Sequence, residues 1–209
     1  MDSALPFASG LAPVFPGGAA GLSLLELAHP GPLPARLEAY AGLTLAALGR
    51  QAAAWIDGVL SLHPGATELD FLDFVIDRVD DPVVSSLARF ERALSVARTA
   101  RADGLPPVPA RPGPRLQLHP AARTLELPGP AEQVIGAVAL GLEVPPYAGW
   151  PVLVAPGLPT LWRKASVLED ALCTWLTRPR TTDAVRARFP AVARVLPRLI
   201  AARAIVAAD

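Results

Sequence analysis

The sequence has few of the side chains that usually carry chemistry. Its 209 residues include one cysteine and three histidines. A single cysteine excludes an internal disulfide, and Cys173 in the apolar stretch ALCTWL is typical of core packing. His29, His63 and His119 each precede a proline. No two of them have the i,i+3 or i,i+4 spacing of a local metal-ligand pair, so they are interpreted as turn residues.

Other signatures are also missing. No serine stands in a Gly-x-Ser-x-Gly elbow, and PGGAAG and GPRLQL match neither nucleotide-binding fingerprint. The first 15 residues contain no Lys or Arg, so no signal-peptide pattern is present. The longest helical apolar stretch, 43–60, is interrupted by Arg50, Gln51 and Asp57, which argues against a membrane span. We therefore expect a cytoplasmic binding protein, whereas a stand-alone enzyme would require a bound metal or cofactor.

Charge and proline divide the chain into two halves. Residues 1–104 carry 7 basic and 12 acidic groups, and residues 105–209 carry 12 basic and 7 acidic groups. Five prolines fall within the fourteen residues 102–115. Such a composition cannot continue a helix and suits a stiff, extended linker. The expected domains are 1–104 and 115–209, joined by a linker at 105–114. Either the halves bind different partners or both surfaces are simply solvated.

The first half is expected to be a helical bundle. Helical spacing predicts one long helix from Pro34 to Leu62. Thr67 and Asp70 form a capping-box pattern before the next helix, and Asp81 is expected to cap a third. Four carboxylates recur at i, i+3, i+7 and i+10 and are predicted to share one helical face: Asp70, Asp73, Asp77 and Asp80. This face either is solvated or docks on a basic partner.

The second half changes to strand periodicity. RLQLHP and RTLELP alternate apolar and polar residues, and PAEQVIGAVALGL is helical. The stretches 150–157 and 158–165 are expected to form a hairpin, after which Ser166 and Glu169 form a second capping box. Further helices are expected after a cap at Thr181 or Thr182 and from about 191 to 204. The predicted fold class is α+β, with a C-terminal winged helix-turn-helix-like domain and a small antiparallel sheet.

The last helical region favours peptide over DNA. AVARVLPRLIAARAIVAAD is mostly apolar and has no Asn, Gln, Ser or Thr to read base edges. Pro197 must break or kink it. A cleft between such a segment and a strand suits an extended peptide that adds to a sheet edge. A winged-helix transcription regulator that binds DNA is the alternative, and strongly salt-dependent DNA binding would identify it.

Residues 150–206 resemble the precursor-peptide recognition element of ribosomal peptide pathways. The matching pieces are Val152–Pro156, Leu161, Glu169–Leu176, Thr181–Val185, Phe189 and Leu199–Val206. Arg178, Pro179 and Arg180 stand where that family usually has a glycine. The resemblance covers about 55 residues at the level of pattern.

The stretch SSLARFERALSVAR is similar to a helix of the small partner proteins of multinuclear non-haem iron oxidases, which act in methanobactin and 3-thiaglutamate type pathways. The resemblance implies a non-catalytic subunit that binds the leader of a precursor peptide. It also implies a heterodimer with the barrel-shaped iron oxidase, which modifies the core peptide. The iron is then expected in the oxidase, with no cofactor or metal in this chain and no nucleic acid or membrane as partner.

The resemblance also suggests which residues bind. The strand 159–165 is expected to pair with the leader peptide, with Leu161 and Arg163 on one face. The peptide-binding candidates are Thr160, Leu161, Trp162, Arg163, Lys164, Arg194 and Arg198. The two last arginines are assigned to acidic leader side chains or, alternatively, are only solvated. The acidic face of the helical half is assigned to docking on the oxidase.

Overall fold

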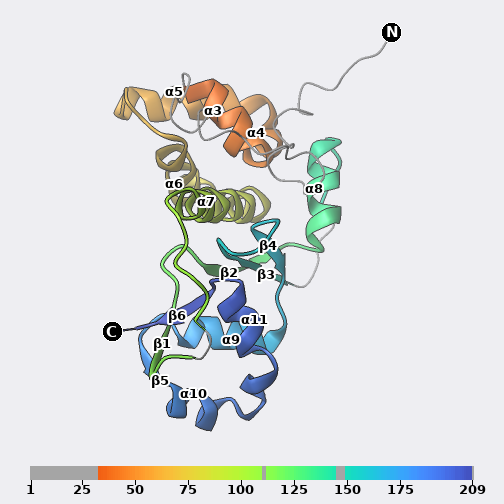
Figure 1. Ribbon diagram of the computed structural model, residues 1–209. Helices are drawn as coiled ribbons and strands as arrows, with labels where there is room; N and C mark the ends of the chain where they lie inside the picture. The colour runs from red at the N-terminus through yellow and green to blue at the C-terminus, as the bar shows by residue number, and fades with distance from the viewer. Residues whose placement is uncertain (1–32, 110–111, 145–148, 209) are drawn as a thin grey trace. The chain divides into compact units, whose positions relative to one another are not determined.

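The computed structural model describes residues 33–109, 112–144 and 149–208. Residues 1–32 of the expected helical domain therefore lie outside the described residues. The protein is a mixed α+β structure with two small antiparallel sheets (Figure 1). The predicted fold class is thus confirmed at the level of α+β.

Two compact units make up the chain. Unit 1 comprises Met1–Ser95 and Leu127–Trp150, and unit 2 comprises Val96–Glu126 and Pro151–Asp209. Residues 127–150, assigned above to the C-terminal domain, fall in unit 1. The proposed linker at 105–114 falls in unit 2.

Helices form the described part of unit 1. They are α3 (Leu33–Tyr40), α4 (Gly42–Leu48), the 3-10 turn η1 (Gly49–Gln51), α5 (Ala52–Leu62), α6 (Glu68–Arg78), α7 (Pro82–Ala102) up to Ser95, and α8 (Ala131–Ala139). Both predicted N-terminal caps are confirmed. Thr67 and Asp70 form the reciprocal capping box of α6, and Asp81 accepts hydrogen bonds from the amides of Val83 and Val84 at the start of α7.

The prediction of a single helix from Pro34 to Leu62 is wrong. The chain turns between α3 and α4 and again at Gly49, whose φ is 53°. Glu91 on α7 is fully buried, and its carboxylate accepts from the amides of Leu43 and Thr44 at 2.8 and 2.9 Å. The Thr44 hydroxyl donates to the same carboxylate at 2.6 Å. A long-range acceptor thus satisfies the first amides of α4, which favours a new helix start over a continuous helix.

Unit 2 contains the strands. One sheet has the order β5-β1-β6, with β1 (Arg115–Leu118) between β5 (Arg180–Thr181) and β6 (Ile205–Ala207). The other has the order β2-β3-β4, formed by β2 (Arg123–Leu127), β3 (Trp150–Val154) and β4 (Trp162–Lys164). The helices of this unit are α9 (Val167–Trp175), α10 (Thr182–Arg188), the 3-10 turn η2 (Pro190–Arg194) and α11 (Leu196–Ala201). Figure 1 shows α9, α10 and α11 gathered beside the sheet of β1.

The predicted helix from about 191 to 204 is only partly correct. Pro197 lies in the first turn of α11, and Arg203 has a φ of 57° and ends the helical course. Ile205 and Val206 then pair with β1, opposite Leu118 and Gln117. Branched side chains favour the extended form when a neighbouring strand is available, and β1 supplies that strand.

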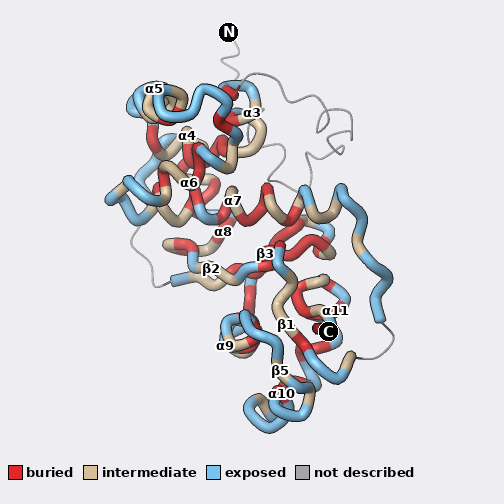
Figure 2. The backbone as a smooth tube through the Cα atoms, turned by 90° about the vertical axis from the view of Figure 1, so that its left-hand side faces the viewer, coloured by how far each residue is buried: buried red, intermediate tan, exposed pale blue. Residues whose placement is uncertain are grey.

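Each unit has its own apolar core. In unit 1, Leu37, Phe71 and Leu72 are fully buried, and buried positions recur along α7 (Figure 2). In unit 2, one cluster of buried residues includes Leu116 of β1 and Leu172 of α9. Cys173 belongs to this second cluster. The strand β1 and the helix α9 are therefore fixed to each other by packing.

Candidate functional site

The β3–β4 hairpin holds five of the predicted peptide-binding residues. Leu153 lies opposite Arg163. The amide of Ala155 donates to the Leu161 carbonyl at 2.8 Å, and that of Ala165 donates to the Pro151 carbonyl at 2.9 Å. The predicted hairpin is confirmed, and its odd-numbered residues turn their main chain toward β3. The strand is shorter than predicted, because β4 begins only at Trp162.

The residues just before β4 form its turn. Leu161 is buried with a φ of 65°, which an extended strand does not allow. Thr160 also lies outside β4, and its hydroxyl donates to the Trp162 carbonyl at 2.6 Å. In an antiparallel pair, the main-chain groups of alternate residues point toward and away from the neighbouring strand. The odd-numbered residues of the hairpin bond to β3, so the main-chain groups of Trp162 and Lys164 point away from it. Trp162 and Lys164 already have interaction partners there, so an added peptide would have to exchange with them.

Arg163 already forms an ion pair with another residue of the chain, Glu169. Its guanidinium forms two hydrogen bonds to the Glu169 carboxylate, at 2.6 and 3.0 Å. Glu169 also accepts from the amide and hydroxyl of Ser166, which confirms the predicted capping box. Burial opposes the ionisation of Glu169, yet these hydrogen bonds outweigh it and lower its pKa to about 2. The pair ties the end of β4 to the start of α9.

The loop of the hairpin is held from α7. The Arg101 guanidinium donates to the carbonyls of Pro156 and Pro159, at 2.7 and 3.3 Å, and also to the carbonyl of Leu158. Burial lowers the pKa of Arg101. One side chain therefore satisfies three carbonyls of an otherwise irregular loop and fixes where β4 begins.

Arg194 and Arg198 are exposed and lie on separate elements. Arg194 ends η2, and Arg198 is the third residue of α11, with Val195 between the two elements. Within the described part of the chain, neither arginine has a carboxylate within 4.0 Å. The break that Pro197 was expected to impose is therefore present, and the two guanidinium groups do not share one continuous helix.

The four aspartates of the predicted docking face have different roles. Asp70 caps α6, and Asp73 pairs with Arg92 of α7 at 2.5 and 3.1 Å. Asp77 is exposed on α6. Asp80 lies beyond the end of α6, so the prediction that all four share one helical face is wrong. The helix stops early because Val79 adopts an extended conformation before the capped start of α7.

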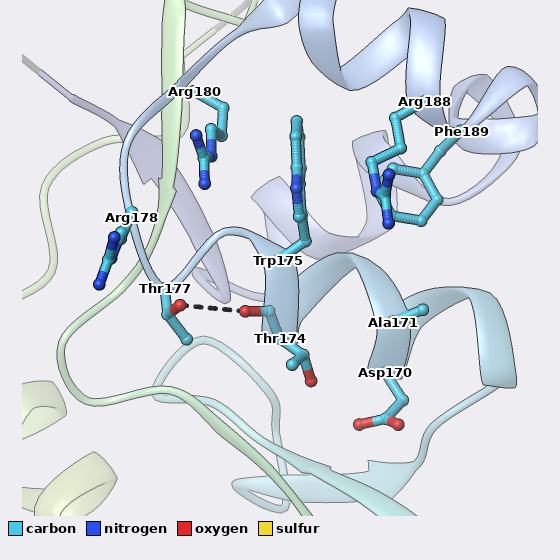
Figure 3. Close-up of a pocket in the computed structure, with 9 residues that line it drawn as sticks. All are labelled: Asp170, Ala171, Thr174, Trp175, Thr177, Arg178, Arg180, Arg188 and Phe189. Carbon is cyan, nitrogen blue, oxygen red and sulfur yellow. Dashed lines mark hydrogen bonds between the residues drawn. The ribbon is translucent and has the colours of Figure 1, made fainter.

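A cavity that the sequence did not indicate lies beside α9. Its volume is about 540 Å³, and it is lined by Asp170, Ala171, Thr174, Trp175, Thr177, Arg178, Arg180, Arg188 and Phe189. The Arg180 guanidinium carbon lies 4.9 Å from the centre of the Trp175 ring, and that of Arg188 lies 5.7 Å from it. Figure 3 shows the two arginines on opposite sides of the indole. The cavity therefore combines the aromatic rings of Trp175 and Phe189 with three cations and one carboxylate.

Local structure explains how these side chains meet. Helix α9 ends at Trp175, and the Thr177 hydroxyl donates to the Thr174 carbonyl at 3.0 Å in the turn that follows. Arg180 is then fixed by the pairing of β5 with β1. Thr181, one of the two predicted cap residues, caps α10, and this helix carries Arg188 at its end. The useful sequence signal was the tryptophan at the end of a capped helix, followed by three arginines around a second cap.

Cys173 of α9 is fully buried. Burial raises the pKa of its thiol to about 12, so the thiol stays protonated at neutral pH. Among the residues that the structure describes, no group of three or more His, Cys, Asp or Glu side chains is placed to hold a metal ion. None of the described helices has both the length and the apolar character needed to cross a membrane.

Comparison with known proteins finds no match among protein-family models, curated proteins or solved structures. The resemblance described above is therefore neither supported nor opposed by a relative. The two features from which a function can be argued are the β3–β4 hairpin with its capped helix and the cationic cavity around Trp175. Apart from Trp150 at the start of β3, both lie within unit 2.

Proposed function

We propose that this chain is a non-catalytic subunit that binds the leader of a ribosomally made precursor peptide and presents it to a multinuclear non-haem iron oxidase. In this proposal, β2, β3 and β4 with α9, α10 and α11 act as a winged helix-turn-helix-like recognition module. The observation that carries it is the place of β4, which ends the order β2-β3-β4 and leads directly into a capped helix.

An extended peptide alongside β4 would add a fourth strand to this sheet. Main-chain hydrogen bonds give such strand addition its affinity, and alternate side chains give it specificity. The rigid support of β4 favours this role, because Arg163 joins the strand to Glu169 of α9 and Arg101 holds the preceding loop. The peptide would exchange with the present partners of Trp162 and Lys164.

Arg194 and Arg198 supply charge for the same guest. Both are exposed and carry no ion pair among the described residues. Under this proposal they contact acidic side chains of the leader, and the exposed Pro197 between them gives an apolar contact, whereas Val195 and Leu196 are buried in the core. Pairing of surface charges contributes more to the association rate and to specificity than to affinity.

Unit 1 is proposed to dock on the oxidase. Asp77 and Asp80 are exposed, whereas Asp70 and Asp73 are already engaged in a cap and in an ion pair. A basic oxidase surface would therefore contact mainly Asp77 and Asp80. The iron and the oxidation chemistry belong to the oxidase in this proposal, and this chain supplies binding and orientation of the peptide.

Isothermal calorimetry with the leader peptide tests the proposal, with and without the oxidase present. We expect saturable binding that weakens several-fold in Arg198→Gln and is unchanged in the control Arg50→Gln, which removes an exposed arginine of unit 1. Absence of binding in both conditions would refute the proposal. Steeply salt-dependent retardation of genomic DNA fragments would instead identify a DNA-binding protein.

A further inference from the structure

Three arginines of unit 2 line one cavity, which has a single carboxylate, that of Asp170. Arg178, Arg180 and Arg188 line it, and within the described residues none of them forms an ion pair. Arg180 Nε is buried and has no hydrogen-bond partner there. By contrast, Arg186, two residues from Arg188, pairs with Asp183 at 3.7 Å and does not line the cavity. The positive charge is therefore concentrated where the surface is hollowed.

The aromatic residues position these cations. Arg180 and Arg188 lie over the Trp175 ring, and Phe189 meets that ring edge to face at 5.7 Å between centroids. Stacking on an indole holds a guanidinium without using its N–H donors. The donors thus remain available for a planar anion such as a carboxylate, which arginine binds through two parallel hydrogen bonds.

We propose that this cavity binds the carboxylate of an acidic residue in a peptide, with Arg188 as its bidentate donor and with Arg180, on the other side of the Trp175 ring, adding positive charge. This inference rests on the proposed function in one respect: it takes the acidic residue to belong to the leader peptide. The volume of about 540 Å³ accommodates one or two side chains. None of the peptide-binding residues predicted above lines this cavity, so the inference adds Trp175, Arg180 and Arg188 to the site.

The geometry favours an acidic peptide over nucleic acid. Single-stranded nucleic acids bind proteins by stacking bases on exposed aromatic faces. Here guanidinium groups lie on both sides of the Trp175 ring (Figure 3). The carboxylate of Asp170 also lines the cavity and would repel a continuous phosphate backbone. A single carboxylate bound by Arg188 needs no free face of Trp175, and it brings one negative charge near Asp170 where a phosphate backbone would bring several.

The test uses the ¹⁵N-labelled full chain and two blocked decapeptides, one of alternating Ser and Glu and one of alternating Ser and Gln. The indole N–H signal of Trp175 is assigned from its loss in Trp175→Phe. We expect the Glu peptide to shift this signal saturably and the Gln peptide to leave it unchanged. Arg188→Gln should weaken binding about tenfold, as expected for one charge-assisted bidentate contact, and Arg186→Gln should not.

Because Arg188 is exposed at the end of α10, the variant should fold, and Arg188→Lys gives a second measurement in which charge is kept and the bidentate geometry is lost. No shift at Trp175 with the Glu peptide overturns the inference. So does equal weakening by Arg186→Gln, or tighter binding of a decathymidine strand at the same salt concentration. If the leader binds but leaves the Trp175 signal unchanged, the cavity assignment fails while the proposed function stands.

Discussion

The ion pair between Arg163 and Glu169 gives the sharpest test of how the proposed site is supported. Glu169 is 2% exposed and receives four hydrogen bonds from the side chain of Arg163 and from Ser166. Substitution of Glu169 by Gln keeps the shape and removes the charge. The Arg163 guanidinium and the end of β4 then lose their bidentate partner.

The expected loss follows from the acidity of Glu169. Its pKa falls from the usual 4.5 to about 2 in the folded protein. One pKa unit corresponds to about 1.4 kcal/mol, so ionisation of this residue stabilises the fold by about 3 kcal/mol at neutral pH. Because the folded pKa is the lower one, this contribution is complete above the unfolded pKa and is lost as pH falls toward 2.

Urea unfolding between pH 7 and pH 2 measures this contribution. We expect Glu169→Gln to lower the free energy of unfolding by about 3 kcal/mol at pH 7, with a difference from wild type that shrinks below pH 4.5. The control Asp170→Asn removes the neighbouring carboxylate and should change stability by less than about 0.5 kcal/mol. A Glu169→Gln protein as stable as wild type at pH 7, or a difference that does not depend on pH, would refute this reasoning.

Three further outcomes are expected. Arg101→Ala should lower the free energy of unfolding by about 2–3 kcal/mol in urea, because three loop carbonyls lose their donor. Gly157→Ala should destabilise by at least about 2 kcal/mol in the same assay, since its Cβ would come within 2.7 Å of the Ala202 main chain. Cys173 should react with iodoacetamide at pH 8 only after unfolding, as a buried thiol with a pKa of about 12 requires; labelling of the native protein would contradict this.

Local signals predicted the start of each capped helix. The boxes at Thr67 and Ser166 and the cap at Thr181 form within three residues, so the sequence alone specifies them. The β3–β4 hairpin was predictable for the same reason, since its strands are close in the sequence. Pro197 likewise marked the break before the last helix, because proline cannot continue a helix from within.

Long-range contacts account for what the sequence did not reveal. The break before α4 depends on Glu91, which lies 48 residues from Leu43. The strand β6 exists because β1 is available to pair with it, whereas the composition of this segment alone favours a helix. Propensity is a weak guide wherever a tertiary partner offers a buried hydrogen bond or a sheet edge.

The candidate site shows the same limit. The pattern predicted the strand at Trp162–Lys164 but extended it too far toward Pro159. The pairing of Arg163 with Glu169 was not foreseen, because i,i+6 pairs across a strand-to-helix turn have no simple periodicity. The cavity was missed because Trp175, Arg180 and Arg188 belong to three elements whose arrangement depends on the pairing of β5 with β1. Spacing along the sequence does not express that arrangement.

Hydrogen–deuterium exchange of the full chain tests the central claim most directly. The probe is the leader peptide that the proposal requires, added at saturating concentration together with the proposed oxidase. If the chain recognises the leader by strand addition, exchange should slow in residues 160–165 of the hairpin. Unchanged exchange in this segment, or protection confined to unit 1, would contradict the account.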